Sequence, residues 1–177
     1  TESVEHFSTT QVGALNATQV RALTTTQAQT FSAEQIGSLT TTNVAALSTA
    51  QLRAISETNI SALDSAQAAA LTTSQLVGLT TTQVAALTST DIGELSANQI
   101  GAFAGTQIAR LTETAVGALT TTQAAALKTT QITALAATQL GALQSTTLAG
   151  LATTQVAALT TTQVSGLDST TAAGLTR

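Results

Sequence analysis

Cysteine, proline, methionine, tryptophan and tyrosine are absent from this chain of 177 residues, and its only aromatic residues are three phenylalanines. Without cysteine there are no disulfides and no thiolate metal sites. This absence does not identify the cellular compartment of the protein. Only 8% of the residues are charged, and the five basic ones are scattered, so the basic stripe of a nucleic-acid-binding protein is missing. No apolar run approaches the roughly 18 residues of a membrane span, and no signal peptide is recognisable. We expect neither a nucleic-acid partner nor a membrane span.

Catalytic and ligand-binding patterns are equally scarce. His6 is the only histidine, and no nucleophile or carboxylate stands at a recognisable spacing from it. The sequence has no calcium-binding loop, and its glycines do not follow the spacing of a phosphate-binding loop. Asp64 and Asp168 fall at predicted helix starts, where the helix dipole stabilises negative charge. We therefore predict a protein that is not an enzyme and has no cofactor or metal site.

What the chain does have is a large apolar residue at every eighth position, from Phe7 through Leu15 to Leu175. The segment 79–86, Leu-Thr-Thr-Thr-Gln-Val-Ala-Ala, shows the full unit. Thr, Ser, Asp or Asn usually follows the Leu, and Gln usually precedes the smaller apolar residue. The period is unbroken, which predicts one continuous octapeptide-repeat solenoid over residues 1–177, with about 22 octads and no internal boundary.

Each octad carries a helix-start signal. Thr80 can cap the helix while Gln83 reaches back to the Thr80 backbone N–H, which is a capping box, and Leu79 and Val84 form a hydrophobic staple. A new start every eight residues limits each helix to about two turns. Small residues before the Leu, such as Gly78, are expected to let the chain bend. The predicted capping residues are Thr80, Gln83, Thr120, Gln123, Thr160 and Gln163, and the predicted core residues are Phe7, Leu15, Phe31, Leu79, Leu87, Phe103, Leu127 and Leu159.

Two rival folds fit the pattern less well. In one continuous helix the Leu row would shift by about 80° per octad and wind around the helix, exposing half of these residues. In a β-solenoid, favoured by Thr and Val, the Leu and Val positions would lie on opposite faces of a strand. The Ala-Ala-Leu segments also favour helix. We predict an all-α solenoid with one short capped helix per octad, and keep the β-solenoid as the alternative.

Departures from the consensus recur at every third octad or at multiples of it. Phenylalanine replaces leucine at Phe7, Phe31 and Phe103, all in one 24-residue phase. This predicts three octads per coil with a triangular cross-section, although duplication of a 24-residue block would leave the same pattern. Glutamines one coil apart could then stack their amides into ladders, as in other repetitive assemblies.

Runs of three threonines are the one surface feature with a possible binding role, at residues 24–26, 40–42, 80–82, 120–122 and 160–162. The first Thr of each run is used in capping. The other two could face ice or polysaccharide, or carry O-linked sugars. Glu34, Ala50, Ala66 and Asn98 interrupt the outer Thr row, which argues against a perfect binding surface.

The octad resembles the Leu-[Ser/Thr]-x-x-Gln-[Val/Ile]-x-[Ala/Gly] repeats of giant repetitive bacterial surface proteins, which are described as adhesin-like or haem-utilisation-like. Related octads place proline after the cap, and this chain has none. The resemblance implies an extracellular or cell-surface fibre, stalk or coat, and no haem ligand is visible here to support the haem description.

Our hypothesis is a structural, non-enzymatic rod whose uncapped ends self-associate into a filament, sheath or surface fibre. Its partners would be further copies or further repeats of the same kind. The alternatives are a passive adhesin stalk and a Thr-row module that binds ice or a glycan.

Overall fold

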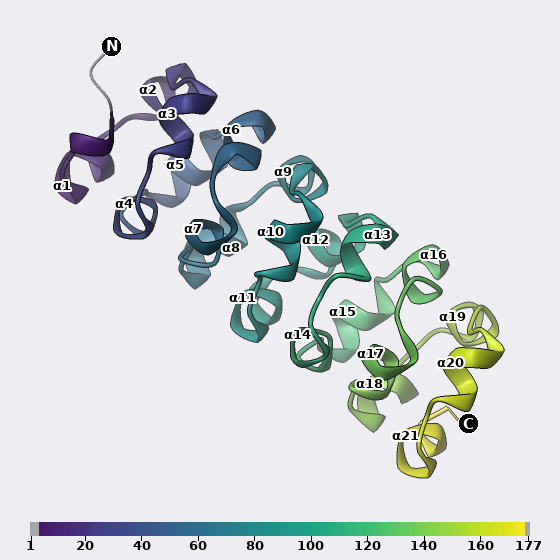
Figure 1. The fold of residues 1–177 in the computed structure, drawn as a ribbon. Helices are drawn as coiled ribbons and strands as arrows, with labels where there is room; N and C mark the ends of the chain where they lie inside the picture. The colour runs from purple at the N-terminus through teal and green to yellow at the C-terminus, as the bar shows by residue number, and fades with distance from the viewer. Residues whose placement is uncertain (1–3, 176–177) are drawn as a thin grey trace. The chain divides into compact units, whose positions relative to one another are not determined.

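The computed structural model describes residues 4–175, and these residues are all-helical (Figure 1). One 3-10 turn is followed by 21 α-helices of four to six residues, one for each octad from residue 9 onward, and no strand is found within the described range. The prediction of an all-α solenoid of very short helices is confirmed, and the β-solenoid alternative is wrong for these residues.

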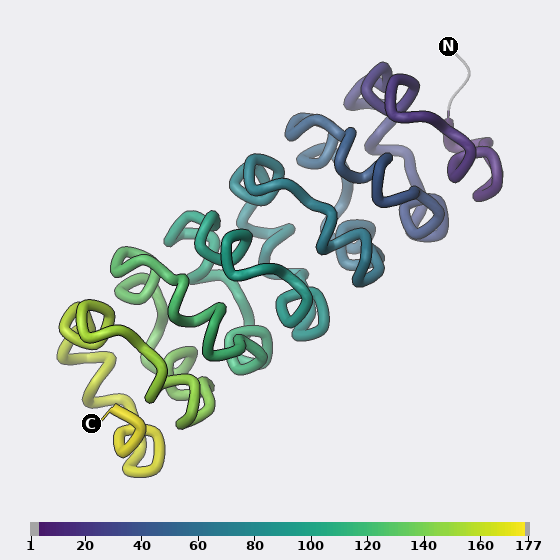
Figure 2. The backbone as a smooth tube through the Cα atoms, turned by 180° about the vertical axis from the view of Figure 1, so that it is seen from behind, coloured from purple at the N-terminus to yellow at the C-terminus, as the bar shows by residue number. Residues whose placement is uncertain are grey.

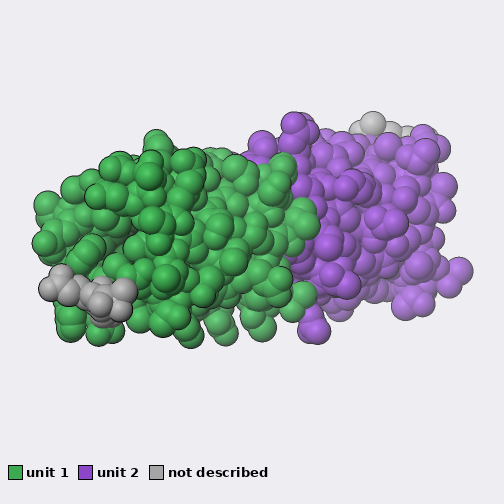
Figure 3. Space-filling view, turned by 90° about the horizontal axis from the view of Figure 1, so that it is seen from above, with its two compact units in different colours: residues 1–86 green, residues 87–177 purple. Residues whose placement is uncertain are grey.

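The chain groups into two compact units, residues 1–86 and 87–177 (Figure 3). The first contains η1 Val4–His6, α1 Thr9–Gly13, α2 Ala17–Ala22, α3 Thr25–Gln29, α4 Ala33–Gly37, α5 Thr41–Ala46, α6 Thr49–Ala54, α7 Glu57–Ile60, α8 Ser65–Ala70, α9 Thr73–Gly78 and α10 Thr81–Ala85. The second contains α11 Ser89–Glu94, α12 Ala97–Ala102, α13 Gly105–Ile108, α14 Glu113–Gly117, α15 Thr121–Ala125, α16 Thr129–Ile132, α17 Ala137–Gly141, α18 Ser145–Ala149, α19 Thr153–Ala157, α20 Thr161–Ser165 and α21 Ser169–Ala173. The absence of a boundary in the array stays a prediction.

Two extended residues separate α9 from α10. Leu79 has φ −60° and ψ 146°, and Thr80, the N-cap of α10, has φ −70° and ψ 159°. The Thr80 hydroxyl accepts a hydrogen bond from the Gln83 N–H at 3.1 Å, and the Gln83 side-chain oxygen accepts one from the Thr80 N–H at 2.9 Å. This reciprocal pair satisfies two of the free N–H groups of the first turn, so a helix can restart every eight residues.

Within each unit, helices pack against the helix three places along the chain. In the first unit α2 contacts α5, α3 contacts α6 and α6 contacts α9, and in the second unit α11 contacts α14 and α12 contacts α15. The backbone of each unit accordingly follows the same three-helix path coil after coil (Figure 2). Three octads therefore make one coil, as the 24-residue recurrence predicts. A helix of one or two turns is unstable alone, so its stability comes from these neighbouring coils.

The Val and Leu rows form the core of each unit. Val84 and Val116 have no exposed surface, and the Leu residues of interior coils are nearly as well buried. The predicted core residues Phe31, Leu79, Leu87, Phe103 and Leu127 are buried, whereas Phe7, Leu15 and Leu159 are half-buried. These last three lie in the first or the last coils of the described chain, so one side of each lacks a covering coil.

The glycines act differently from the prediction. No described glycine has a positive φ, so Gly78 and its counterparts do not bend the chain through a left-handed conformation. Several instead lie where two coils approach closely. A Cβ at Gly117 would lie 2.9 Å from the Ala142 carbonyl oxygen, and one at Gly78 would collide with the Thr49 methyl group. At these positions glycine allows close packing between coils.

Two equivalent glycines give a matched test of this explanation. Gly117 and Gly141 each end a five-residue helix, one coil apart, but a Cβ at Gly141 would meet no atom within 4 Å. We expect Gly141→Ala to stabilise the protein by up to about 1 kcal/mol, since alanine is the better helix former. Gly117→Ala should destabilise it by about 1–3 kcal/mol through overpacking. Urea unfolding of both variants measures the difference, and equal effects would contradict the packing role.

Candidate functional site: glutamine bridges between coils

The glutamine at the third helical position is buried and bonded in two directions. Gln83 is 2% exposed. Its side-chain oxygen accepts from the Thr80 N–H, and its amide nitrogen donates to the carbonyls of Leu52 and Ile55, each at 2.7 Å. One side chain thus closes the start of its own helix and ties that helix to the preceding coil. We call this arrangement a glutamine bridge.

The bridges repeat with fixed spacing, because the accepting carbonyls precede the glutamine by 28 and 31 positions in the sequence. In the first unit they join Gln35 to Val4 and Phe7, Gln51 to Val20 and Leu23, Gln67 to Ile36 and Leu39, and Gln75 to Val44 and Leu47. In the second they join Gln123 to Ile92 and Leu95, Gln131 to Ile100 and Phe103, Gln155 to Ala124 and Leu127, and Gln163 to Ile132 and Leu135. The final carbonyls of a helix lack partners within it, and the bridge supplies one.

The prediction that stacked glutamines form amide ladders is wrong for these bridges. The amide nitrogens donate to backbone carbonyls and not to the glutamine one coil away. The spacing gives the reason. Equivalent glutamines lie three octads apart, whereas the accepting carbonyls lie three and a half to almost four octads back, where one helix of the preceding coil ends and the next begins. Glutamine does stabilise both the helix cap and the stacking of coils, but its hydrogen-bond partners are backbone groups and not other glutamine side chains.

Substituted positions show why glutamine is suited to the bridge. Asn43, which is one methylene shorter, donates to the Leu15 carbonyl at 3.0 Å but forms no capping box. Conversely, where Ala104 replaces the capping hydroxyl, the Gln107 oxygen still accepts from the Ala104 N–H at 2.7 Å. The glutamine half of the box therefore survives loss of the cap, whereas a shorter amide performs only half of the bridge.

The predicted capping pairs lie in this network. Thr120 and Gln123 form both bonds of a capping box, at 2.8 and 3.2 Å. Thr160 and Gln163 do the same, at 2.9 and 3.2 Å. Sequence reasoning found the capping role of these glutamines but missed their two carbonyl partners. The signal that could have found these partners is the position of the glutamine beside the Val row in every octad. A polar side chain that is buried there must form its hydrogen bonds inside the protein.

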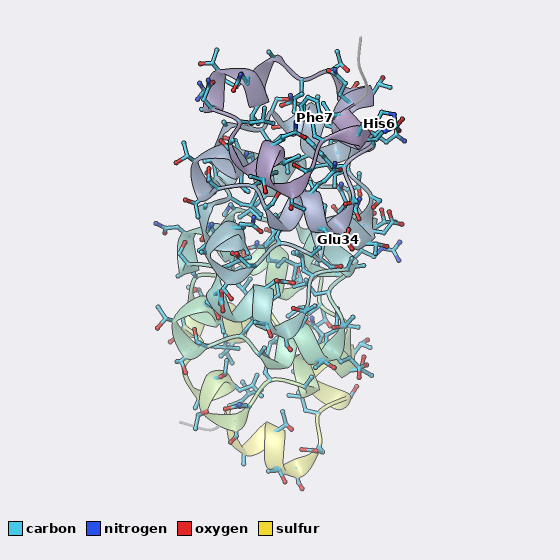
Figure 4. All side chains as sticks on the ribbon, turned by 90° about the vertical axis from the view of Figure 1, so that its left-hand side faces the viewer. His6, Phe7 and Glu34 are labelled. Carbon is cyan, nitrogen blue, oxygen red and sulfur yellow. The ribbon has the colours of Figure 1, made fainter. Side chains whose placement is uncertain are left out.

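Of the described titratable groups, Asp91 is buried at a helix start and the others lie on the surface. His6 is exposed and pairs with Glu5 at 3.4 Å, and in Figure 4 it projects from the edge of the first coil while Phe7 points inward. A backbone hydrogen bond holds the pKa of Glu34 below its ordinary value, and the Thr171 N–H does the same for the pKa of Asp168 at the start of α21. Within residues 4–175 there is no group of three metal-binding side chains, and no helix has the length and hydrophobicity to cross a bilayer.

The three threonines of an octad have different surroundings. The first caps the helix. The methyl group of the second, as at Thr49 and Thr121, packs against a glycine of the next coil, at Gly78 and Gly150. The third is exposed, and nine successive octads keep it as threonine: Thr106, Thr114, Thr122, Thr130, Thr138, Thr146, Thr154, Thr162 and Thr170. The interruptions of this row that the sequence shows all lie between residues 34 and 98.

Removing one bridge tests its energetic weight. Gln123→Ala would leave the carbonyls of Ile92 and Leu95 and the N–H of Thr120 without their partner in a buried setting. We expect it to lower the free energy of unfolding by about 3 kcal/mol, since each unsatisfied buried group costs about 1–3 kcal/mol before water relieves part of the loss. The control Thr122→Ala, on an exposed neighbour, should change stability by less than about 0.5 kcal/mol. Similar urea midpoints for the two variants would contradict the bridge.

Comparison with known families identifies part of the chain as a repeat. A family model described as the ALTTAQ repeat matches residues 4–41 and 41–73. The six letters recur in the chain with single changes, as Ala-Leu-Ser-Thr-Ala-Gln at 46–51 and Ala-Leu-Thr-Thr-Ser-Gln at 70–75. No curated protein and no solved structure matches the chain. The motif holds the Leu that ends one helix, the cap that starts the next and the glutamine of the bridge. The match thus supports a structural repeat protein.

Proposed function

We propose that this chain is a structural, non-enzymatic repeat protein whose end coils associate with further copies to form a filament, sheath or surface fibre. The glutamine bridge is the observation that carries the proposal. Within each unit a bridge donates from one coil to the carbonyls of the coil before it, so an interior coil is completed by a neighbour on each side. A fold built in this way continues as long as further coils of the same kind are supplied.

Within residues 4–175, the first and last coils leave apolar surface uncovered, and this surface supports the proposal. Val164 in α20 is 49% exposed, whereas the equivalent Val116 in α14 is fully buried. A hollow of about 380 Å³ opens beside Leu148, Leu151, Val156 and Leu175 in the last coils of the second unit. At the other end Phe7, Leu15 and Leu23 are half-buried. Covering this apolar surface with another coil is favourable by about 25 cal/mol for each Å² removed from water.

The extracellular or cell-surface location is also a proposal, and it is supported by the resemblance of the octads to those of repetitive bacterial surface proteins. Within that setting a passive adhesin stalk needs the same stacked coils without self-association. Exposed threonines at coil spacing, such as Thr106, Thr130 and Thr154, favour a second candidate, a surface for ice or polysaccharide. Their hydroxyls are free of the capping and packing roles of the other threonines.

Assembly is tested by imaging the purified chain by negative-stain electron microscopy over a concentration series, together with sedimentation velocity. We expect filaments of uniform width above a critical concentration. Leu167→Asp should raise that concentration more than tenfold, because burying an unpaired carboxylate in the contact costs more than the roughly 1.4 kcal/mol that corresponds to a tenfold change. The triple variant Thr106→Ala, Thr122→Ala and Thr138→Ala serves as the surface control and should assemble like the unmodified chain.

Circular dichroism verifies that the variants keep their helices. Discrete particles of the unmodified chain at every concentration would contradict self-association. Binding of the chain to insoluble polysaccharide or to ice, lost in the threonine variant, would then favour the second candidate. Filaments of Leu167→Asp at the unmodified concentration would exclude association through the exposed core.

A further inference from the structure

We propose that α18 is a yield point of the second unit, that is, a segment that opens reversibly while the helices before and after it stay docked on their neighbouring coils. Three features of Ser145–Ala149 carry the proposal: the start of the helix, its bond to the preceding coil and its contact with α21. Opening of α18 is a property of the second unit alone and does not depend on the proposed self-association.

The start of α18 lacks both halves of the capping box. Gln144 stands at the N-cap and makes no side-chain bond to the first turn, and Thr147 replaces the glutamine that would accept from the Gln144 N–H. Every other α-helix of residues 4–175 keeps at least one half. In α19, for example, Ala152 offers no cap, but the Gln155 oxygen still accepts from the Ala152 N–H at 2.7 Å. The first turn of α18 therefore lacks the side-chain partners that stabilise the start of the other helices.

The bond from α18 to the preceding coil is also weak. The Thr147 hydroxyl donates to the Leu119 carbonyl at 3.4 Å, which is long for a hydrogen bond, and the side chain has no amide that could reach the Val116 carbonyl as well. The equivalent Gln155 in α19 donates to two carbonyls of that coil at 2.9 and 2.6 Å. Thr147 is 3% exposed, so the weak bond lies inside the unit and not at its surface.

The contact between α18 and α21 has no amide bridge either. α18 packs between α15 and α21, and at α21 Thr171 again takes the place of the bridging glutamine. A groove of about 350 Å³ opens between the two helices and is lined by small residues, among them Ser145, Thr146 and Ala149 of α18. Neither neighbour of α18 in this stack is therefore joined to it by a side-chain amide.

The helices on both sides of α18 along the chain are bridged. Gln139 of α17 donates to the Leu111 carbonyl at 2.6 Å. After α18, the bridges of Gln155 in α19 and of Gln163 in α20 are complete. α18 is thus a single weakly held helix between firmly held ones, and its weakness does not increase steadily along the sequence.

Opening of α18 alone would lengthen its coil without releasing the coils on either side. The five residues of α18 span about 8 Å as a helix, at 1.5 Å per residue, and up to about 17 Å when extended. They would become a link between α17 and α19, which stay docked through Gln139 and Gln155. Under tension the segment with the lowest free energy of opening opens first, so a structural protein gains length here before its core separates.

Residue-resolved amide hydrogen exchange, followed by NMR, tests this opening. The N–H groups of Leu140 in α17, Leu148 in α18 and Val156 in α19 each donate to the N-cap carbonyl of their own helix at 3.0 Å. Leu148 is also better buried than Val156, so local structure alone does not favour its exchange. We expect the protection factor of Leu148 to be at least about tenfold lower than those of Leu140 and Val156, because α18 lacks several stabilising hydrogen bonds.

Two variants and one control assign the cause. Thr147→Gln supplies the bridging amide and half of the capping box, and should raise the protection of Leu148 to that of Val156. Gln155→Thr removes both from α19 and should lower the protection of Val156 at least about tenfold. The matched control Thr146→Gln places the same side chain one position away on the exposed surface. It should change the protection of Leu148 less than about twofold, since it adds helix propensity but no bridge.

The pattern of protection along the chain decides the outcome. Protection that falls steadily from α17 through α18 to α20 would overturn the yield point, because it would indicate fraying. Equal protection of Leu140, Leu148 and Val156 would overturn it as well. An effect of Thr146→Gln as large as that of Thr147→Gln would exclude the bridge as the cause, and this comparison holds even where Gln155→Thr disrupts the unit. Exchange is measured on dilute, unassembled protein, so failure of the chain to form filaments would leave the result unchanged.

Discussion

The whole architecture depends on one buried amide that bonds in two directions. Glutamine is neutral, carries both an acceptor and two donors, and is long enough for its oxygen to reach the N-cap while its nitrogen reaches the preceding coil. Glutamate would lose the donor, lysine would lose the acceptor, and asparagine at position 43 reaches only one partner. Because the amide is uncharged, it can be buried in every coil without the desolvation cost of an ion.

This constraint explains the composition as well as the fold. A helix that restarts every eight residues needs a cap, a bridging amide and two core residues, which leaves few positions free for charge. Asp64 and Asp168 occupy helix starts, where they replace the capping Thr. Asp91 replaces the glutamine and keeps its capping role. Its carboxylate accepts hydrogen bonds from the Thr88 N–H and hydroxyl at 2.7 and 2.8 Å.

Much of the fold was predictable because its signals are local. The capping box of Thr80 and Gln83 lies within four residues, and three octads per coil follow from the 24-residue recurrence of Phe7, Phe31 and Phe103. The bridges were not predictable, because the carbonyl partners carry no side-chain signature and depend on how one coil sits on another. The glycines were misjudged for the same reason. A glycine before the Leu suggests a bend in the chain, but at Gly117 it reflects the approach of Ala142 from the next coil.

A bridge that always donates toward the earlier coil gives each unit a direction. Side-chain amides face one way along the stack and carbonyl pairs face the other, so the two ends of a unit are chemically different even though its octads are nearly identical. Apolar surface alone would permit many contacts, since burial is non-directional. Each buried amide must instead meet the carbonyls at which the preceding coil passes from one helix to the next, and this requirement selects among the contacts. The specificity of the contacts between coils therefore comes from backbone groups, which every octad presents in the same way whatever its outer residues are.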